Sequence, residues 1–173
     1  PVAPAAAATT AVDGFDVAPQ VAARLGMSIE ELRRGFAAAG ERQLHEGTIT
    51  VDEFWQRFLQ HTGVRAPGEL WGEEFTPVQR PAMYVLAERI KAAGYRLVAG
   101  TNTIAPHYDA HVQRRDYDVF DHVYASHLMH VSKPDAAFWE QILSAEGVTP
   151  AEALFVDDLE ENVVAARGVG LTA

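Results

Sequence analysis

The chain has 173 residues, a formal net charge of −10 and no cysteine. This length allows one ordinary domain, or one domain with a modest insertion, and 48% hydrophobic residues suffice for a core. The acidity argues against a nucleic-acid partner, and no apolar run reaches the roughly 18 to 20 residues of a membrane span. The lack of cysteine excludes disulfides, thiolate nucleophiles and Cys-bound zinc. It is compatible with a reducing compartment, so we expect a cytoplasmic protein.

The N-terminal segment, residues 1–15, is rich in alanine and threonine rather than in valine and isoleucine. Buried parallel strands are typically rich in the latter. We therefore predict an irregular segment with an incomplete first strand. The chain lacks an initiator methionine, and another strand is predicted to begin at residues 171–173, so we expect that both ends have been shortened.

Residues 16–80 are predicted to form a small helical unit followed by a linker. Two capping boxes, Ser28 with Glu31 and Thr50 with Glu53, each predict the start of a helix. The aromatic residues of these helices are expected to form a core. Residues 64–80 contain several Pro and Gly residues, which is typical of a linker.

Residues 81–173 alternate between helical and strand patterns, which predicts a parallel sheet with helices on both faces. This is a doubly wound α/β fold that carries the helical unit as a subdomain. The predicted helices cover residues 81–93, 107–114, 136–146 and 162–167, and the predicted strands cover residues 95–99, 120–124 and 153–156.

Three polar stations follow the apolar runs of this region: Thr101 with Asn102, then Lys133, then Asp157 with Asp158. Ligands of open α/β sheets bind at the carboxyl ends of the strands, so these side chains are expected to converge. The hydroxyl and amide can donate to phosphoryl oxygens, and the lysine can neutralise a phosphate. The paired carboxylates suit Mg²⁺.

Each station also has a plainer interpretation. A Thr-Asn turn after a strand is common, and Asp158 can be a helix N-cap. His107 and His111 would share a helix face as a metal pair, but a half-buried helix face without metal is favoured because no zinc-protease pattern surrounds them. The order of hydroxyl, lysine and paired aspartates is more specific than any single station.

In these motifs the chain resembles the haloacid dehalogenase-like hydrolase superfamily, over residues 81–173 above all, and residues 16–63 resemble its small helical cap. The resemblance implies that Thr101 binds the transferred phosphoryl group and that Asn102 helps to shape the site. It also implies that Lys133 is the third-motif lysine and that Asp157 and Asp158 hold Mg²⁺.

The sequence departs from the family at its first motif, an Asp-x-Asp whose first Asp is the nucleophile. The only early carboxylates are Asp13 and Asp16, which are three positions apart rather than two. They match better the stretch that leads into the cap, so the nucleophile is unknown. Either the first motif is missing because the chain has been shortened, or this is a family member without the nucleophile.

The resemblance favours a Mg²⁺-dependent phosphatase that acts on a small phosphorylated metabolite through an aspartyl-phosphate. A 2-haloacid dehalogenase ranks behind it, because a metal-free site has no use for two adjacent aspartates. A non-catalytic binding or regulatory protein is the alternative from another class. We expect no nucleic-acid or membrane partner, and the sequence identifies neither the substrate nor the oligomeric state.

Overall fold

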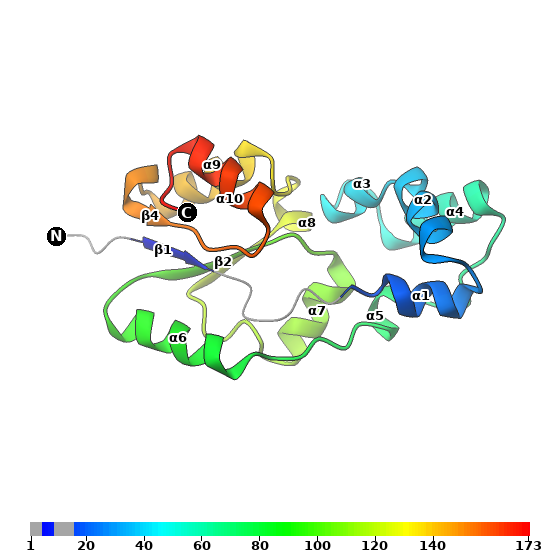
Figure 1. The fold of residues 1–173 in the computed structure, drawn as a ribbon, viewed down its shortest axis with the longest axis horizontal. Coiled ribbons are helices and arrows are strands. Elements are labelled where there is room, and N and C mark those ends of the chain that lie inside the picture. Colours follow the sequence, from blue (N-terminus) through cyan, green and yellow to red (C-terminus); the bar gives the residue numbers. More distant parts are fainter. Residues whose placement is uncertain (1–4, 9–15) are drawn as a thin grey trace.

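The computed structural model describes the backbone of residues 5–8 and the whole of residues 16–173, and Figure 1 shows its two parts. A four-stranded parallel sheet in the order β3-β2-β1-β4 forms the centre of one part. Its strands are β1 (Ala5–Ala8), β2 (Leu97–Thr101), β3 (His122–Ala125) and β4 (Ala153–Leu154). The predicted doubly wound α/β fold is therefore confirmed.

The N-terminal segment, predicted to be irregular with an incomplete first strand, contributes one short strand to the sheet. Residues Ala5–Ala8 form β1 in the middle of the sheet, where Ala7 pairs with Val98 of β2 and Ala6 with Leu154 of β4. Alanine has a weak preference for strands, so the local composition gave no signal. The backbone groups of β1 are paired with β2 on one side and with β4 on the other, and the local sequence carries no sign of this pairing. Residues 1–4 and 9–15, and with them Asp13, lie outside the described residues.

The far end of the chain also joins the sheet. Thr172 forms a parallel bridge with Leu154, and its carbonyl oxygen accepts a hydrogen bond from the Phe155 amide at 2.7 Å. The pairing predicted near residues 171–173 thus occurs, at one residue beside β4.

Helices cover both faces of the sheet, with α6 (Pro81–Ala92) on one and α9 (Ala136–Glu146) and α10 (Glu160–Val169) on the other. The larger core lies under α9 and α10, where Phe138, Trp139 and Phe155 are almost fully buried. The short elements α7 (Ala105–Gln113), α8 (Ser126–Met129) and the 3-10 turn Pro150–Glu152 connect the strands.

The second part is the helical unit, which lies beyond the carboxyl ends of the strands in Figure 1. We refer to it as the cap; its elements are α1 (Ala18–Leu25), α2 (Ile29–Ala39), α3 (Glu41–His45), α4 (Val51–Thr62) and α5 (Leu70–Glu73). Both predicted capping boxes are present. Phe36 is buried among Phe54, Phe58 and Trp71, as expected for an aromatic core.

Two short helices of the cap, α3 and α5, were not predicted. With five and four residues they are too short to show a helical period. The linker predicted for residues 64–80 accordingly contains α5, whose first amides bond to the Glu69 carboxylate. No helix in the described part of the chain is both long and apolar enough to cross a membrane.

Candidate active site

The three polar stations end or follow β2, β3 and β4 in the chain, and the cap lies beyond the carboxyl ends of these strands (Figure 1). Thr101 is the last residue of β2 and is half-buried. Lys133 follows β3 and α8, and Asp157 follows β4. Because all four strands are parallel, their carboxyl ends point the same way, and the loops that follow them can converge.

The closest contact of the site joins Lys133 to Asp157. The Lys133 Nζ donates to the Asp157 Oδ2 at 2.6 Å, and the two side chains are only 7% and 6% exposed. Asp157 Oδ1 accepts two further bonds, from the Leu159 amide at 2.9 Å and from Asn162 Nδ2 at 3.0 Å. Burial alone would raise the pKa of Asp157, but the Lys133 charge and these hydrogen bonds together hold that pKa below its usual value. The carboxylate is therefore ionised at neutral pH.

Asn102 fixes the lysine loop to the end of β2. Its Nδ2 donates to the Lys133 carbonyl oxygen and its Oδ1 accepts from the Lys133 amide, both at 2.8 Å. This reciprocal pair of bonds sets the backbone position from which the lysine side chain reaches Asp157. Asn102 is thus a positioning residue for Lys133.

Two further residues complete the acidic side. Asp158 is exposed next to Asp157, in the loop before α10. Asn162, in the first turn of α10, is buried and holds Asp157 through the bond described above. We did not predict a site role for Asn162; its signal is the position five residues after Asp157, on the helix that follows the acidic pair.

Asp16 is already engaged at the start of the cap. Its Oδ1 accepts from the Ala18 amide at 3.0 Å, and its Oδ2 forms an ion pair with Arg33 at 3.0 Å. A carboxylate held by a helix start and an arginine is less available as a nucleophile.

The acidic pair offers part of a metal site. Asp157 and Asp158 are the hard oxygen ligands that Mg²⁺ takes, one or two at a time, together with water and substrate phosphate. Within residues 5–8 and 16–173, no three His, Asp or Glu side chains gather closely enough to hold a metal by themselves. The two aspartates could supply only part of such a ligand shell.

The two histidines considered as a metal pair have other partners. His107 Nε2 lies 2.9 Å from the Trp71 carbonyl oxygen, and its ring stacks on Phe75. His111 Nδ1 lies 2.8 Å from a carboxylate oxygen of Asp116. One ring nitrogen of each histidine therefore already has a hydrogen-bond partner within the protein.

A cleft of about 660 Å³ opens between the cap and the sheet edge. The core side presents Asn102, Ser132, Lys133, Pro134, Asp135 and Glu161, and the cap side presents Glu41, Arg42 and His45 of α3. A substrate phosphate that reaches Lys133 would thus have the rest of its molecule against α3.

The cap is fastened to the core directly beside this cleft. Ser126 Oγ donates to the His45 carbonyl oxygen at 2.6 Å, and Ser132 Oγ donates to Glu46 Oε1 at 3.0 Å. His130 Nδ1 lies 2.9 Å from the Glu46 carbonyl oxygen. These contacts, together with the close approach of Gly47 to the His127 backbone, position α3 over the site.

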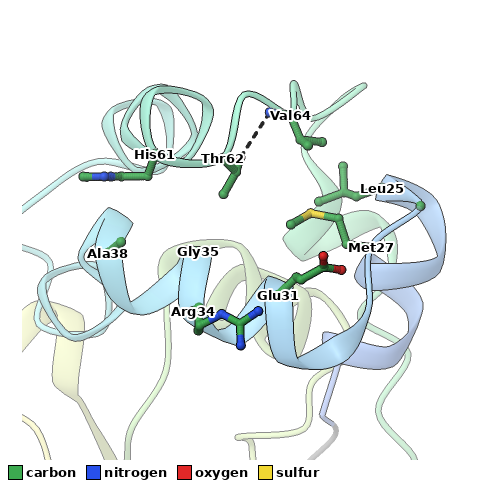
Figure 2. Close-up of a pocket in the computed structure, with 10 residues that line it drawn as sticks. Leu25, Met27, Glu31, Arg34, Gly35, Ala38, His61, Thr62 and Val64 are labelled. Carbon is green, nitrogen blue, oxygen red and sulfur yellow. Dashed lines mark hydrogen bonds between the residues drawn. The ribbon is translucent and has the colours of Figure 1, made fainter.

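A second cavity, of about 510 Å³, lies inside the cap between α2 and the end of α4 (Figure 2). Its labelled walls include Met27, Glu31, Arg34 and His61. None of the three polar stations contributes to it. It is therefore separate from the candidate active site.

Comparison with known proteins agrees with this architecture. The chain is 34% identical over 137 residues to the sesquiterpene phosphatase astK of Aspergillus oryzae, a match that spans 75% of this chain and 68% of that protein. The fold is similar to that of a HAD family enzyme from Bacteroides thetaiotaomicron, with a TM-score of 0.81, 17% identity and coverage of 97% and 90% of the two chains.

Two further solved structures share the fold. The Bacteroides enzyme in complex with magnesium and inorganic phosphate, as an Asp-to-Ala mutant, has a TM-score of 0.70 at 21% identity and 96% and 89% coverage. A dehalogenase has a TM-score of 0.64 at 19% identity, with 96% and 81% coverage. The model of the haloacid dehalogenase-like hydrolases matches residues 3–170. With nearly the whole chain matched, and with the parallel sheet and its polar edge in place, this protein belongs to the haloacid dehalogenase-like hydrolase family.

Proposed function

We propose that this protein is a Mg²⁺-dependent phosphatase that hydrolyses a small phosphorylated molecule. The observation that carries the proposal is the buried Lys133–Asp157 pair at the carboxyl edge of the sheet, of which Lys133 lines the cleft. A sequence relative is a phosphatase by name, and a protein of the same fold has been crystallised with magnesium and phosphate.

The residues of the three polar stations would each contribute to phosphate binding. The Lys133 ammonium group would neutralise negative charge on the phosphoryl oxygens as a point charge, while Asp157 keeps it in place. The Thr101 hydroxyl, at the end of β2, would donate to one of those oxygens. Asp157 and Asp158 would hold Mg²⁺, which when bound supplies further charge neutralisation of the phosphate.

Hydrolysis through an aspartyl-phosphate also needs a carboxylate in line with the phosphorus. Asp16 is engaged with Ala18 and Arg33, and the other early aspartate, Asp13, lies outside the described residues. In the sequence, two threonines rather than an Asp-x-Asp follow β1 directly. This favours one second candidate, a phosphate-binding member of the family without turnover.

A dehalogenase remains the weaker candidate, although a dehalogenase shares the fold. Dehalogenation of 2-haloacids requires no metal, so Asp158, which is exposed beside the Lys133–Asp157 pair, would have no function in that reaction. The acidic pair thus supports phosphate chemistry.

The test is to measure phosphate release from p-nitrophenyl phosphate and from a panel of phosphate monoesters, with Mg²⁺ and with excess chelator. We expect release that depends on Mg²⁺ and is lost in Asp157→Asn. Calorimetric binding of inorganic phosphate is measured in parallel. Binding without turnover would select the second candidate, and turnover that persists in chelator would refute the magnesium assignment.

If turnover is present, Asp13→Asn identifies or excludes the remaining early carboxylate as the nucleophile. Loss of activity in Asp13→Asn with the fold retained, as judged by circular dichroism, would place the aspartyl-phosphate there. Unchanged activity in both Asp13→Asn and Asp16→Asn would exclude an aspartyl-phosphate on either early carboxylate.

A further inference from the structure

The cleft lining carries information about the part of the substrate beyond its phosphate; this inference rests on the proposed function. Of the nine described residues that line the cleft, only Pro134 is apolar. Sites for small apolar molecules are lined mainly by hydrophobic and aromatic side chains. The described walls of this cleft are instead made of carboxylates, cations, an amide, a hydroxyl and an imidazole.

The cap contributes two of these groups from one face of α3. Glu41 and His45 are four residues apart on the same helix, so they lie one above the other and face the same space. Burial lowers the pKa of His45. The charge of Glu46 raises this pKa, and His127 lowers it further. The His45 ring is therefore neutral at pH 7 and offers one hydrogen-bond donor and one acceptor.

Glu41 is half-buried beside this imidazole. Burial raises the pKa of its carboxyl group, and the nearby charges of Arg33 and Asp16 act in opposite directions. A partly desolvated carboxyl group is stabilised when a ligand hydroxyl hydrogen-bonds to it. It is destabilised when an apolar ligand removes its remaining water.

The third cap residue in the cleft is already engaged. Arg42 Nε donates to Glu46 Oε1 at 2.7 Å, and Arg42 Nη2 lies 3.8 Å from Asp135 Oδ2. Arg42 therefore bridges cap and core at the rim, and Glu41 and His45 are the groups that face the substrate.

An isoprenoid chain fits this lining poorly. The substrate class in the name of the Aspergillus relative, a sesquiterpene, is an apolar hydrocarbon. Placing such a chain against Glu41 and His45 would remove their water without supplying hydrogen bonds. A site built to bind hydroxyl groups discriminates strongly against an analogue that lacks them.

We propose that the leaving group of the substrate is a polyhydroxylated alcohol whose hydroxyl groups hydrogen-bond to Glu41 and His45 of α3. The substrate class is then the phosphate monoesters of polyols and sugars. In this respect the chain would differ from its sesquiterpene phosphatase relative.

The experiment measures binding to the 173-residue chain by calorimetry. Inorganic phosphate is titrated in the presence of Mg²⁺, and the phosphate esters in excess chelator, where the proposed function expects no turnover. The probes are inorganic phosphate, a hexose phosphate, glycerol phosphate and geranyl monophosphate. We expect the hexose phosphate to bind about tenfold or more tightly than geranyl monophosphate, as hydrogen-bonded recognition requires. In Glu41→Leu and in His45→Leu this ratio should fall towards one or reverse.

Matched exchanges outside the cleft provide the control. His61→Leu and Glu30→Leu make the same changes at exposed cap positions on α4 and α2, and the ratio should stay as in the unmodified chain. Tighter or equal binding of geranyl monophosphate to the unmodified chain would overturn this inference and leave the phosphatase proposal standing. An equal fall of the ratio in the control variants would also overturn it. If inorganic phosphate fails to bind, the proposed function fails, and this inference fails with it.

Discussion

Replacing Asp157 by Asn should destabilise the protein although the two side chains are nearly isosteric. The amide would keep an oxygen for Leu159 and Asn162, but its NH₂ group would then face the Lys133 ammonium group, donor against donor. Removing one partner of a buried ion pair costs about 3 to 5 kcal/mol, because the other charge stays buried and uncompensated. The open cleft gives Lys133 some access to water, so we expect a loss of about 3 kcal/mol.

The assay is urea unfolding followed by circular dichroism. With a slope of about 2 kcal/mol per molar urea, the loss corresponds to a midpoint lower by about 1.5 M. Lys133→Met should cost a similar amount, and the double variant should lose much less than the sum, with a coupling energy of about 2 kcal/mol. Glu30→Gln, which breaks the exposed pair with Arg34, serves as control and should cost less than about 1 kcal/mol.

Additive losses in the cycle, or a loss in Asp157→Asn no larger than in the control, would refute the argument that the pair is buried and coupled.

The pH dependence of stability gives an independent check. The pKa of Asp157 is depressed in the folded state, so its contribution is fully present above the unfolded value of about 3.9 and is lost as the pH falls through the folded pKa. Asp157→Asn should therefore lose less stability than the unmodified chain on acidification below about pH 4.

Three further predictions concern the cap. Gly47→Ala should cost more stability than Gly63→Ala, both measured in urea, because both glycines have positive φ but only at Gly47 would a Cβ overlap backbone of the core. Burial lowers the pKa of His107 to about 4, so stability should fall by up to about 3 kcal/mol as the pH drops from 6.5 to 4, and less in His107→Phe. Asp16→Asn should leave phosphate release within about threefold and lower the thermal midpoint slightly, since Asp16 serves the start of α1; abolished release would show that Asp16 reacts.

Much of the fold could be predicted because its longer helices carry strong local signals. The capping boxes at Ser28 and Thr50 specify helix starts through their own side chains, and the glycine at position 26 ends α1 in a left-handed conformation. The helix predicted for residues 136–146 is α9 to the residue. The strands were displaced by one or two residues at most of their ends, since strand ends depend on pairing with neighbours.

Some elements were missed, and β1 was predicted only as an incomplete strand, because their stability comes from elsewhere in the molecule. β1 consists of four alanines and is stabilised by its two neighbouring ladders. The helices α3 and α8 contain five and four residues, and they are held by bonds between cap and core such as that from Ser126 to His45. Such contacts join residues far apart in the sequence, and no local pattern reports them.

The residues of the site also fall into a group that could be predicted from the sequence and a group that could not. Asn102, Lys133 and Asp157 follow strand ends, so the parallel topology brings them together, and their spacing could be predicted from sequence. The cap side could not, because Glu41 and His45 lie on α3, whose place over the site is set by its bonds to the core.

The fastening of α3 therefore links the position of the cap to the choice of substrate. The His45 carbonyl oxygen accepts from Ser126, while its imidazole lines the cleft; Glu46 binds Ser132 through its carboxylate and lies near His130 through its carbonyl oxygen. The same short segment that closes the cleft thus carries the groups proposed to select a hydroxylated leaving group. A shift of the cap by one hydrogen-bond length would move the selecting groups away from the substrate while the Lys133–Asp157 pair, held entirely within the core, stayed in place. Phosphate binding and leaving-group selection are separable in this architecture, because each is positioned by a different part of the chain.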